Sequence, residues 1–176
     1  MKFKKFYPKS YLKNIYEIDY NILKNKNIKV LIFDLDNTIA LIDQNKVNDE
    51  TIELFNKLKK DFKIVIISNN TEKRVSQYGK MLECDYVCNE LKPLSKGYNK
   101  IKNKYNIKDK EICIIGDQLV TDMFLGNRKK AYTILVDPMG NKDLKITSLN
   151  RFIERKILNY YKKRNIFKKG DYYHGR

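Results

Sequence analysis

Two aspartates stand two positions apart in the stretch FDLDNTIA, residues 33–40, directly after the apolar residues 30–33. A buried carboxylate is costly unless a cation meets it, so Asp34 and Asp36 indicate a bound cation. A second pair, Asp117 and Asp122, follows another apolar run in the same way. Carboxylates presented like this can hold a divalent metal ion, attack an electrophile or transfer a proton.

Further polar residues follow two other apolar runs. Ser68 and Asn69 come directly after residues 62–67, and Lys92 lies just past residues 85–88. Each of these motifs, taken alone, is typical of a turn or a helix start. The carboxyl ends of parallel strands meet at one edge of a sheet, where ligands bind, so together the motifs predict one site.

The elements that must position these residues follow from the alternation of apolar runs with segments of helical period. Strands are expected at residues 28–34, 62–68, 85–88, 111–117 and 131–136, and helices from near residues 48, 71, 95 and 121. This order predicts an α/β fold with a mainly parallel five-stranded sheet covered on both faces. We expect a basic N-terminal lead segment (1–27), a catalytic domain (28–146), and a basic C-terminal helix with a disordered tail (147–176).

With these motifs the chain resembles the haloacid dehalogenase (HAD) superfamily of phosphotransferases over residues 28–137. The matching motifs are Asp34-x-Asp36-x-Thr38, Ser68, Lys92 and Gly116-Asp117-x-x-x-Thr121-Asp122. The residues within these motifs resemble those of the YqeG-like phosphatases of subfamily IIIA, as do the N-terminal Phe-Tyr-Pro and the stretch SNNTEKRV. That group is related to mitochondrial phosphatidylglycerophosphate phosphatases. The resemblance implies a HAD-like Rossmannoid three-layer sandwich and phosphatase activity.

The resemblance also implies roles for the four aspartates. Oxygen ligands and a phosphate substrate favour Mg2+, held by Asp34, the backbone carbonyl of Asp36 and Asp117. Asp34 would attack phosphorus and form an aspartyl-phosphate, while Asp36 would act as general acid and then as general base. Asp122 would orient metal-bound water.

Four other residues would bind the substrate or support the nucleophile. Ser68 and the amide of Asn69 would hold the phosphoryl oxygens, and Lys92 would add positive charge where negative charge develops. Thr38 would hydrogen-bond Asp34 and fix its rotamer.

The spacing of the motifs leaves no room for a cap domain. Asp36 and Ser68 are separated by 31 residues, and Ser68 and Lys92 by 23, which the expected helices and strands use up. A site without a lid suits a phosphate presented on a protein, a nucleic-acid end or a membrane lipid. The helix expected from Arg151 carries aromatic and basic residues, which fits packing on the sheet edge, contact with an anionic membrane, or RNA binding.

Composition narrows the class of protein. The net charge is +16, but most of the 37 basic residues are lysine, which is typical of compositional drift as well as of an anionic partner. The three cysteines fit small buried side chains better than a disulfide framework, and with a single histidine, His174, the chain has too few ligands for a zinc site. No run is long and apolar enough for a membrane span or a signal peptide, so we expect a cytoplasmic protein, with peripheral contact at the membrane as the alternative.

Two hypotheses about function follow. The first is a magnesium-dependent phosphatase acting on a phosphomonoester, with phosphatidylglycerophosphate as a candidate substrate. The second is a HAD-fold protein that binds RNA or another anionic partner without catalysis. A binding protein has no need for Asp34, Asp36, Lys92 and Asp117 together, which favours the phosphatase. The oligomeric state and the identity of the phosphorylated substrate do not follow from the sequence.

Overall fold

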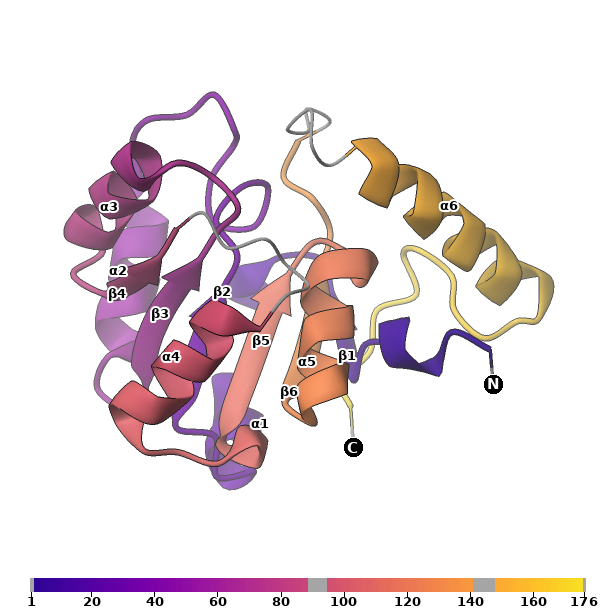
Figure 1. Cartoon of the computed structure of the whole chain (residues 1–176), viewed down its shortest axis with the longest axis horizontal. Coiled ribbons are helices and arrows are strands. Elements are labelled where there is room, and N and C mark those ends of the chain that lie inside the picture. The colour runs from indigo at the N-terminus through magenta and orange to yellow at the C-terminus, as the bar shows by residue number, and fades with distance from the viewer. Residues whose placement is uncertain (1, 89–94, 141–147, 176) are drawn as a thin grey trace.

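The computed structural model describes residues 2–88, 95–140 and 148–175 of the chain. Six parallel strands form one sheet in the order β1-β6-β5-β2-β3-β4 (Figure 1). The strands are β1 (Ser10–Leu12), β2 (Val30–Phe33), β3 (Lys63–Ile67), β4 (Asp85–Val87), β5 (Ile112–Gly116) and β6 (Tyr132–Val136). The predicted α/β class and parallel sheet are confirmed.

The sheet has one strand more than the five expected. Strand β1 comes from the segment 1–27, which sequence analysis treated as a lead outside the catalytic domain. Its residues pair in parallel with β6, from Ser10 beside Ile134 to Leu12 beside Val136, and all three are buried. A strand of three residues shows no alternation of apolar and polar positions, so periodicity could not reveal it.

Helices cover both faces of the sheet. The α-helices are α1 (Tyr20–Asn25), α2 (Asp49–Leu58), α3 (Glu72–Met81), α4 (Lys96–Tyr105), α5 (Phe124–Lys129) and α6 (Ser148–Lys163), with shorter helical turns η1 (Lys4–Phe6), η2 (Ile15–Glu17), η3 (Asp109–Glu111) and η4 (Leu119–Met123). Helices α1, α2 and α3 share one apolar cluster with alternate residues of the strands, and α4 and α5 share another with the remaining residues. Parallel strands buried on both faces explain the continuous apolar runs in the sequence.

The C-terminal residues pack against the β1 edge of the sheet. Ile157 and Tyr161 of α6 and the following Phe167 form a third apolar cluster with Tyr11 of β1. Further along, the backbone of Tyr173 exchanges two hydrogen bonds with that of Tyr11. The residues after Gly170, expected to be disordered, therefore lie along β1 through Gly175.

Within residues 34–88 the chain contains only a loop, α2, β3, α3 and β4, and no cap domain is inserted there. Cys113 is buried in the core, and Cys84 and Cys88 are partly buried against it. Among the described residues, no helix has both the length and the apolar character that crossing a bilayer requires.

Candidate active site

The site lies at the carboxyl ends of the two central strands. The chain runs from β2 outward to β3 and β4, then returns to the other side of β2 as β5, so the direction of strand addition reverses between β2 and β5. Such a switch point is where open α/β sheets bind ligands. Asp34 and Asp36 follow β2 and Asp117 follows β5, and the strands are in register with Phe33 beside Ile115.

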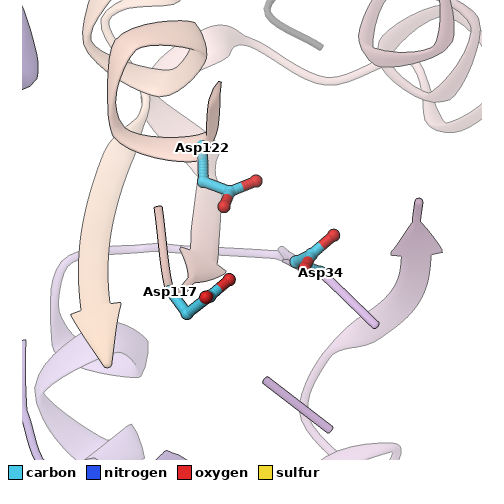
Figure 2. A group of neighbouring side chains, drawn as sticks. All are labelled: Asp34, Asp117 and Asp122. Carbon is cyan, nitrogen blue, oxygen red and sulfur yellow. The ribbon is translucent and has the colours of Figure 1, made fainter. Parts of the chain in front are cut away.

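Three carboxylates meet at this switch point. Asp34, Asp117 and Asp122 each bring an oxygen within 4.8 Å of the others (Figure 2). All three residues are at least 92% buried, with exposed fractions of 8%, 2% and 1%. Like charges this close and this buried repel one another, so the arrangement needs positive charge to persist.

The position of Asp122 depends on the turn that follows β5. Helical turn η4 has π geometry, a form often found at functional sites, and it directs Asp122 back toward the end of the strand. The Gln118 backbone N–H and the Thr121 hydroxyl both donate to Asp122 Oδ2, at 3.3 Å each. Gly116, the last residue of β5, leaves the space that this carboxylate fills, because a Cβ there would lie 2.4 Å from Asp122 Cγ.

We therefore expect Gly116→Ala to displace Asp122 and to weaken divalent-ion binding by about 10- to 100-fold, as loss of an orienting group does at metal sites. Calorimetric titration with Mn2+ measures the change. Gly79→Ala is the matched control, since its new Cβ would also meet a side chain at 2.5 Å, but that of the half-exposed Tyr86, far from the carboxylates. Unchanged Mn2+ affinity in Gly116→Ala would contradict the role assigned to Asp122.

The electrostatics of Asp117 indicate what the cluster can bind. Burial raises the pKa of Asp117 to about 7; Arg151 opposes this shift, while Asp122 and Glu154 add to it. Its Oδ1 atom is buried and accepts no hydrogen bond from any described residue. Carboxylate oxygens in this arrangement fit a hard divalent cation such as Mg2+, which would relieve the repulsion and satisfy that oxygen. Asp34, Asp117 and Asp122 are the residues whose side chains could hold it.

Asp36 lies outside the three-carboxylate cluster, and its side chain contacts residues of β3's carboxyl end and of α3. Its Oδ2 accepts hydrogen bonds from Asn70 Nδ2 at 3.0 Å and from the Ser68 hydroxyl at 3.3 Å. Its Oδ1 accepts from Arg74 Nε at 2.9 Å. Three donors fix the orientation of this carboxylate, which is compatible with a metal contact through the backbone carbonyl and a separate task for the side chain.

Arg74 also fixes the loop above the site. Its two terminal nitrogens donate to the backbone carbonyls of Gln44 and Leu41, at 2.7 and 2.8 Å. The Tyr78 hydroxyl donates to the same Gln44 carbonyl. One guanidinium therefore connects Asp36, helix α3 and the loop that leads to α2, a planar multidentate arrangement that lysine cannot reproduce.

Helix α6 brings a second arginine to the site. Arg151 Nη2 donates to Asp117 Oδ2 at 2.5 Å, and its Nη1 donates to Glu154 Oε2 at 2.8 Å. Glu154 is 5% exposed, and its other oxygen accepts the Leu119 backbone N–H at 2.8 Å. The C-terminal helix is thus tied by buried polar contacts to the turn that follows Asp117.

The other predicted site residues have mixed outcomes. Ser68 lies at the site, but its hydroxyl donates to Asp36 and accepts the Asn70 N–H. Asn69, which follows Ser68, is partly buried at the same strand end. The buried hydroxyl of Thr38 makes no hydrogen bond with any described residue, so the expected bond to Asp34 is wrong in this state. Lys92 lies outside the described residues, and its role stays a prediction.

Sequence reasoning assigned no role to four residues that contact the aspartates or their partners: Asn70, Arg74, Arg151 and Glu154. One compositional signal was available. Arginine is rare in this lysine-rich chain, yet two of its six arginines lie against aspartates of the site. In a chain whose solvated cations are mostly lysine, the few arginines are candidates for multidentate contacts that lysine cannot make.

Comparison with known proteins decides the family. Residues 1–139 match the family described as mitochondrial PGP phosphatase. The chain belongs to this family. It is also 38% identical over 163 residues to a protein from Bacillus subtilis (strain 168) named "Probable phosphatase YqeG", with 92% of this chain and 95% of that protein aligned.

Solved structures of a phosphatase and of a HAD-hydrolase share the fold. The 3-deoxy-D-manno-octulosonate 8-phosphate phosphatase from Yersinia pestis matches with a TM-score of 0.51 at 15% identity, covering 82% of this chain and 89% of that one. The putative HAD-hydrolase YfnB from Bacillus subtilis, bound to magnesium, matches with a TM-score of 0.50 at 12% identity, covering 61% and 88%. This PGP phosphatase family member therefore has the HAD-like fold that the motifs indicated, and it is a HAD-type phosphatase.

Proposed function

We propose that this phosphatase hydrolyses a phosphomonoester with Mg2+ as cofactor and through an aspartyl-phosphate on Asp34. The observation that carries the proposal is the convergence of Asp34, Asp117 and Asp122 at the switch point of the sheet. Membership in a phosphatase family supports the reaction class, and a solved HAD-hydrolase with the same fold is bound to magnesium. A buried carboxylate cluster of this kind favours catalysis over anion binding alone.

The chemistry assigns one task to each group. A divalent ion held by the cluster would neutralise the repulsion between the carboxylates and the substrate phosphate. Asp34 then attacks phosphorus, the bond to the ester oxygen breaks, and the phosphoryl group is carried on Asp34 as an acyl phosphate. Ser68 and the amide of Asn69 donate to the phosphoryl oxygens, and Lys92 supplies a further positive charge.

Asp36 serves both half-reactions. In the first it gives its proton to the departing alkoxide, so that a neutral alcohol leaves. In the second the resulting carboxylate takes a proton from water, whose oxygen attacks the phosphorus and returns Asp34 to its starting form. The contacts of Asp36 with Asn70 and Arg74 would hold its carboxyl in one orientation for both steps, while the Ser68 hydroxyl turns from Asp36 to the phosphoryl group.

We propose phosphatidylglycerophosphate, a phosphomonoester on a membrane lipid, as the substrate. The family description supports this assignment, and so does the surface of α6. The first half of that helix exposes Leu149 (64%), Phe152 (47%) and Ile153 (36%) on the same element that brings Arg151 to Asp117. Exposed lysines follow toward its C-terminal end. Apolar side chains with basic neighbours fit a peripheral contact with an anionic bilayer.

The test is a comparison of phosphate release from phosphatidylglycerophosphate in anionic vesicles, soluble sugar phosphates, nucleotides and phosphopeptides, each with Mg2+ and with chelator. We expect the lipid to have the highest kcat/KM and the chelator to abolish turnover of every substrate. Lys162, Lys163 and Arg164 replaced together by Ala should weaken vesicle binding, since each basic residue near an anionic surface contributes about 1 kcal/mol at low salt. Turnover of a soluble phosphate should not change.

The matched control replaces Lys57, Lys60 and Lys80 by Ala. These three lysines are also exposed, and they lie on or beside α2 and α3, so the change in net charge is the same but falls on another surface. Equal loss of vesicle binding in both variants would mean that the bilayer responds only to total charge. Preference for a nucleotide or phosphopeptide over the lipid would contradict the proposed substrate while leaving the phosphatase mechanism intact.

A further inference from the structure

Helix α6 presents a guanidinium to the reaction site, although it lies outside every motif that defines the carboxylate cluster. We propose that Arg151 binds the phosphoryl group of the substrate and that Glu154 is the positioning residue that holds it there. The inference rests on the proposed phosphatase reaction and adds a binding group to it. The C-terminal helix then supplies part of the phosphate site.

The position of Arg151 is the first argument. Its guanidinium is mostly buried, with 18% of the side chain exposed, and it contacts the fully buried Asp117 carboxylate at 2.5 Å. Asp117 is one of the three aspartates whose oxygens meet within 4.8 Å. Arg151 therefore lies next to the place where a phosphate must come to react with Asp34.

The second argument is how Arg151 is held. Glu154 lies one helical turn after Arg151 on α6. One of its carboxylate oxygens accepts a hydrogen bond from Arg151 Nη1, and the other accepts one from the Leu119 N–H. Burying this carboxylate is costly unless both oxygens are satisfied, as they are here. Apolar contacts of Ile157 and Tyr161 already attach the helix to the sheet edge. The added polar contacts therefore serve to fix Arg151 rather than merely to attach the helix.

Charge balance is the third argument. Asp34, Asp117, Asp122 and Glu154 bring four formal negative charges together, and Arg151 pairs with two of these carboxylates, Asp117 and Glu154. Asp117 can ligate a divalent ion through Oδ1 while Oδ2 faces Arg151, and Glu154 holds the guanidinium beside the cluster with or without the ion. With Arg151 and a divalent ion counted, these four carboxylates still carry a formal charge of −1, so a direct contact with Arg151 would stabilise an incoming phosphate dianion in addition to the proposed contact with Lys92.

The residue type is the fourth argument. Lysine supplies most of the 37 basic residues, yet this position and the one beside Asp36 are arginine. A guanidinium offers parallel N–H donors that match two oxygens of a phosphate, whereas an ammonium acts as a point charge. Arg151 uses separate nitrogens for two carboxylates, so Nη2 can turn from Asp117 to a phosphate oxygen while Nη1 stays on Glu154.

The experiment measures the affinity for inorganic phosphate, the reaction product, by calorimetry at saturating Mg2+. Arg151→Gln should bind phosphate about 10- to 100-fold more weakly, the effect of losing a charged hydrogen-bond donor. Arg151→Lys should fall between this variant and the native protein. Glu154→Gln should also weaken phosphate binding, because its side chain can still accept the Leu119 N–H but no longer carries the charge that holds Arg151.

Arg155→Gln is the matched control, since Arg155 is an exposed arginine on the same helix, and its phosphate affinity should equal that of the native protein. Mn2+ affinity, titrated without phosphate, should not fall in Arg151→Gln, because a positive charge that repels the ion has been removed from beside Asp117. KM for a small soluble phosphomonoester should rise with the phosphate dissociation constant across the series.

Two results would overturn the inference. Phosphate affinity within twofold of native in Arg151→Gln, with tighter Mn2+ binding, would make Arg151 only a counterion of the ion-free site. Equal losses of phosphate affinity in Arg151→Gln and Arg155→Gln would mean that the helix contributes only general charge. In either case a native protein that still turns over phosphomonoesters leaves the proposed function standing, whereas absence of any turnover and any phosphate binding would overturn both.

Discussion

Asp34→Asn should lower kcat by about 10⁴-fold or more, the scale seen when a nucleophile is removed from an enzyme. The change keeps the shape of the side chain and its place after β2, but a neutral amide cannot form an acyl phosphate. Initial rates with Mg2+ and a soluble phosphomonoester measure the loss. Mass spectrometry of acid-quenched native enzyme should in addition find a phosphoryl group on the peptide that contains Asp34, and none in the variant.

The fold of the variant provides its control. Asp34 shares a buried space with Asp117 and Asp122, and removing one of three like charges relieves repulsion in the ion-free protein. We therefore expect the melting temperature without divalent ions to stay the same or rise. Comparable turnover by Asp34→Asn at an unchanged melting temperature would exclude Asp34 as the nucleophile.

Asp36→Asn should reduce kcat by about 10²- to 10⁴-fold, the usual contribution of general acid–base catalysis. Its side chain lies outside the three-carboxylate cluster and faces Ser68, Asn70 and Arg74, so Mn2+ affinity should change little. Parallel measurements of kcat and of the Mn2+ dissociation constant separate the two roles. A variant that lost metal affinity yet kept its rate at saturating Mg2+ would be evidence against the acid–base assignment.

The leaving group sharpens this measurement. An alcohol needs a proton as it departs, whereas a nitrophenolate leaves without one. Asp36→Asn should therefore slow formation of the aspartyl-phosphate more with an alkyl phosphate than with a nitrophenyl phosphate. With the nitrophenyl ester, hydrolysis of the intermediate should become limiting, and the phosphoryl group should accumulate on the enzyme. An equal deficit with both esters and no accumulation would assign Asp36 a purely structural role.

The sequence located the aspartates because each follows an apolar run that must be a buried strand. Parallel topology then places Asp34 and Asp117 on one edge, and only the register of β2 with β5 is needed to bring them together. Asp122 lies in the turn η4 that follows β5, so the same strand end also positions it. These are local consequences of chain direction, which periodicity and spacing reveal.

The contacts of the two arginines do not follow from chain direction and spacing. Arg74 lies one turn into α3, and Arg151 lies 34 residues after its partner Asp117, on a helix whose docking depends on packing against β1 and η4. The apolar residues of each helix indicate which face packs on the sheet, but not that Arg74 or Arg151 meets an aspartate. The same reason hides strand β1, whose three residues are ordered by pairing with β6 and not by their own preferences.

The backbone pairing of Tyr173 with Tyr11 has a consequence for the order in which the protein is completed. The N-terminal strand is synthesised first, but its parallel neighbour, β6, emerges more than a hundred residues later, and its cover, the segment through Gly175, later still. At translation rates of about 5–20 residues per second, the residues of β1 remain without their partner strand β6 for several seconds. Over that interval the nascent chain displays the kind of strand edge that invites pairing with other chains.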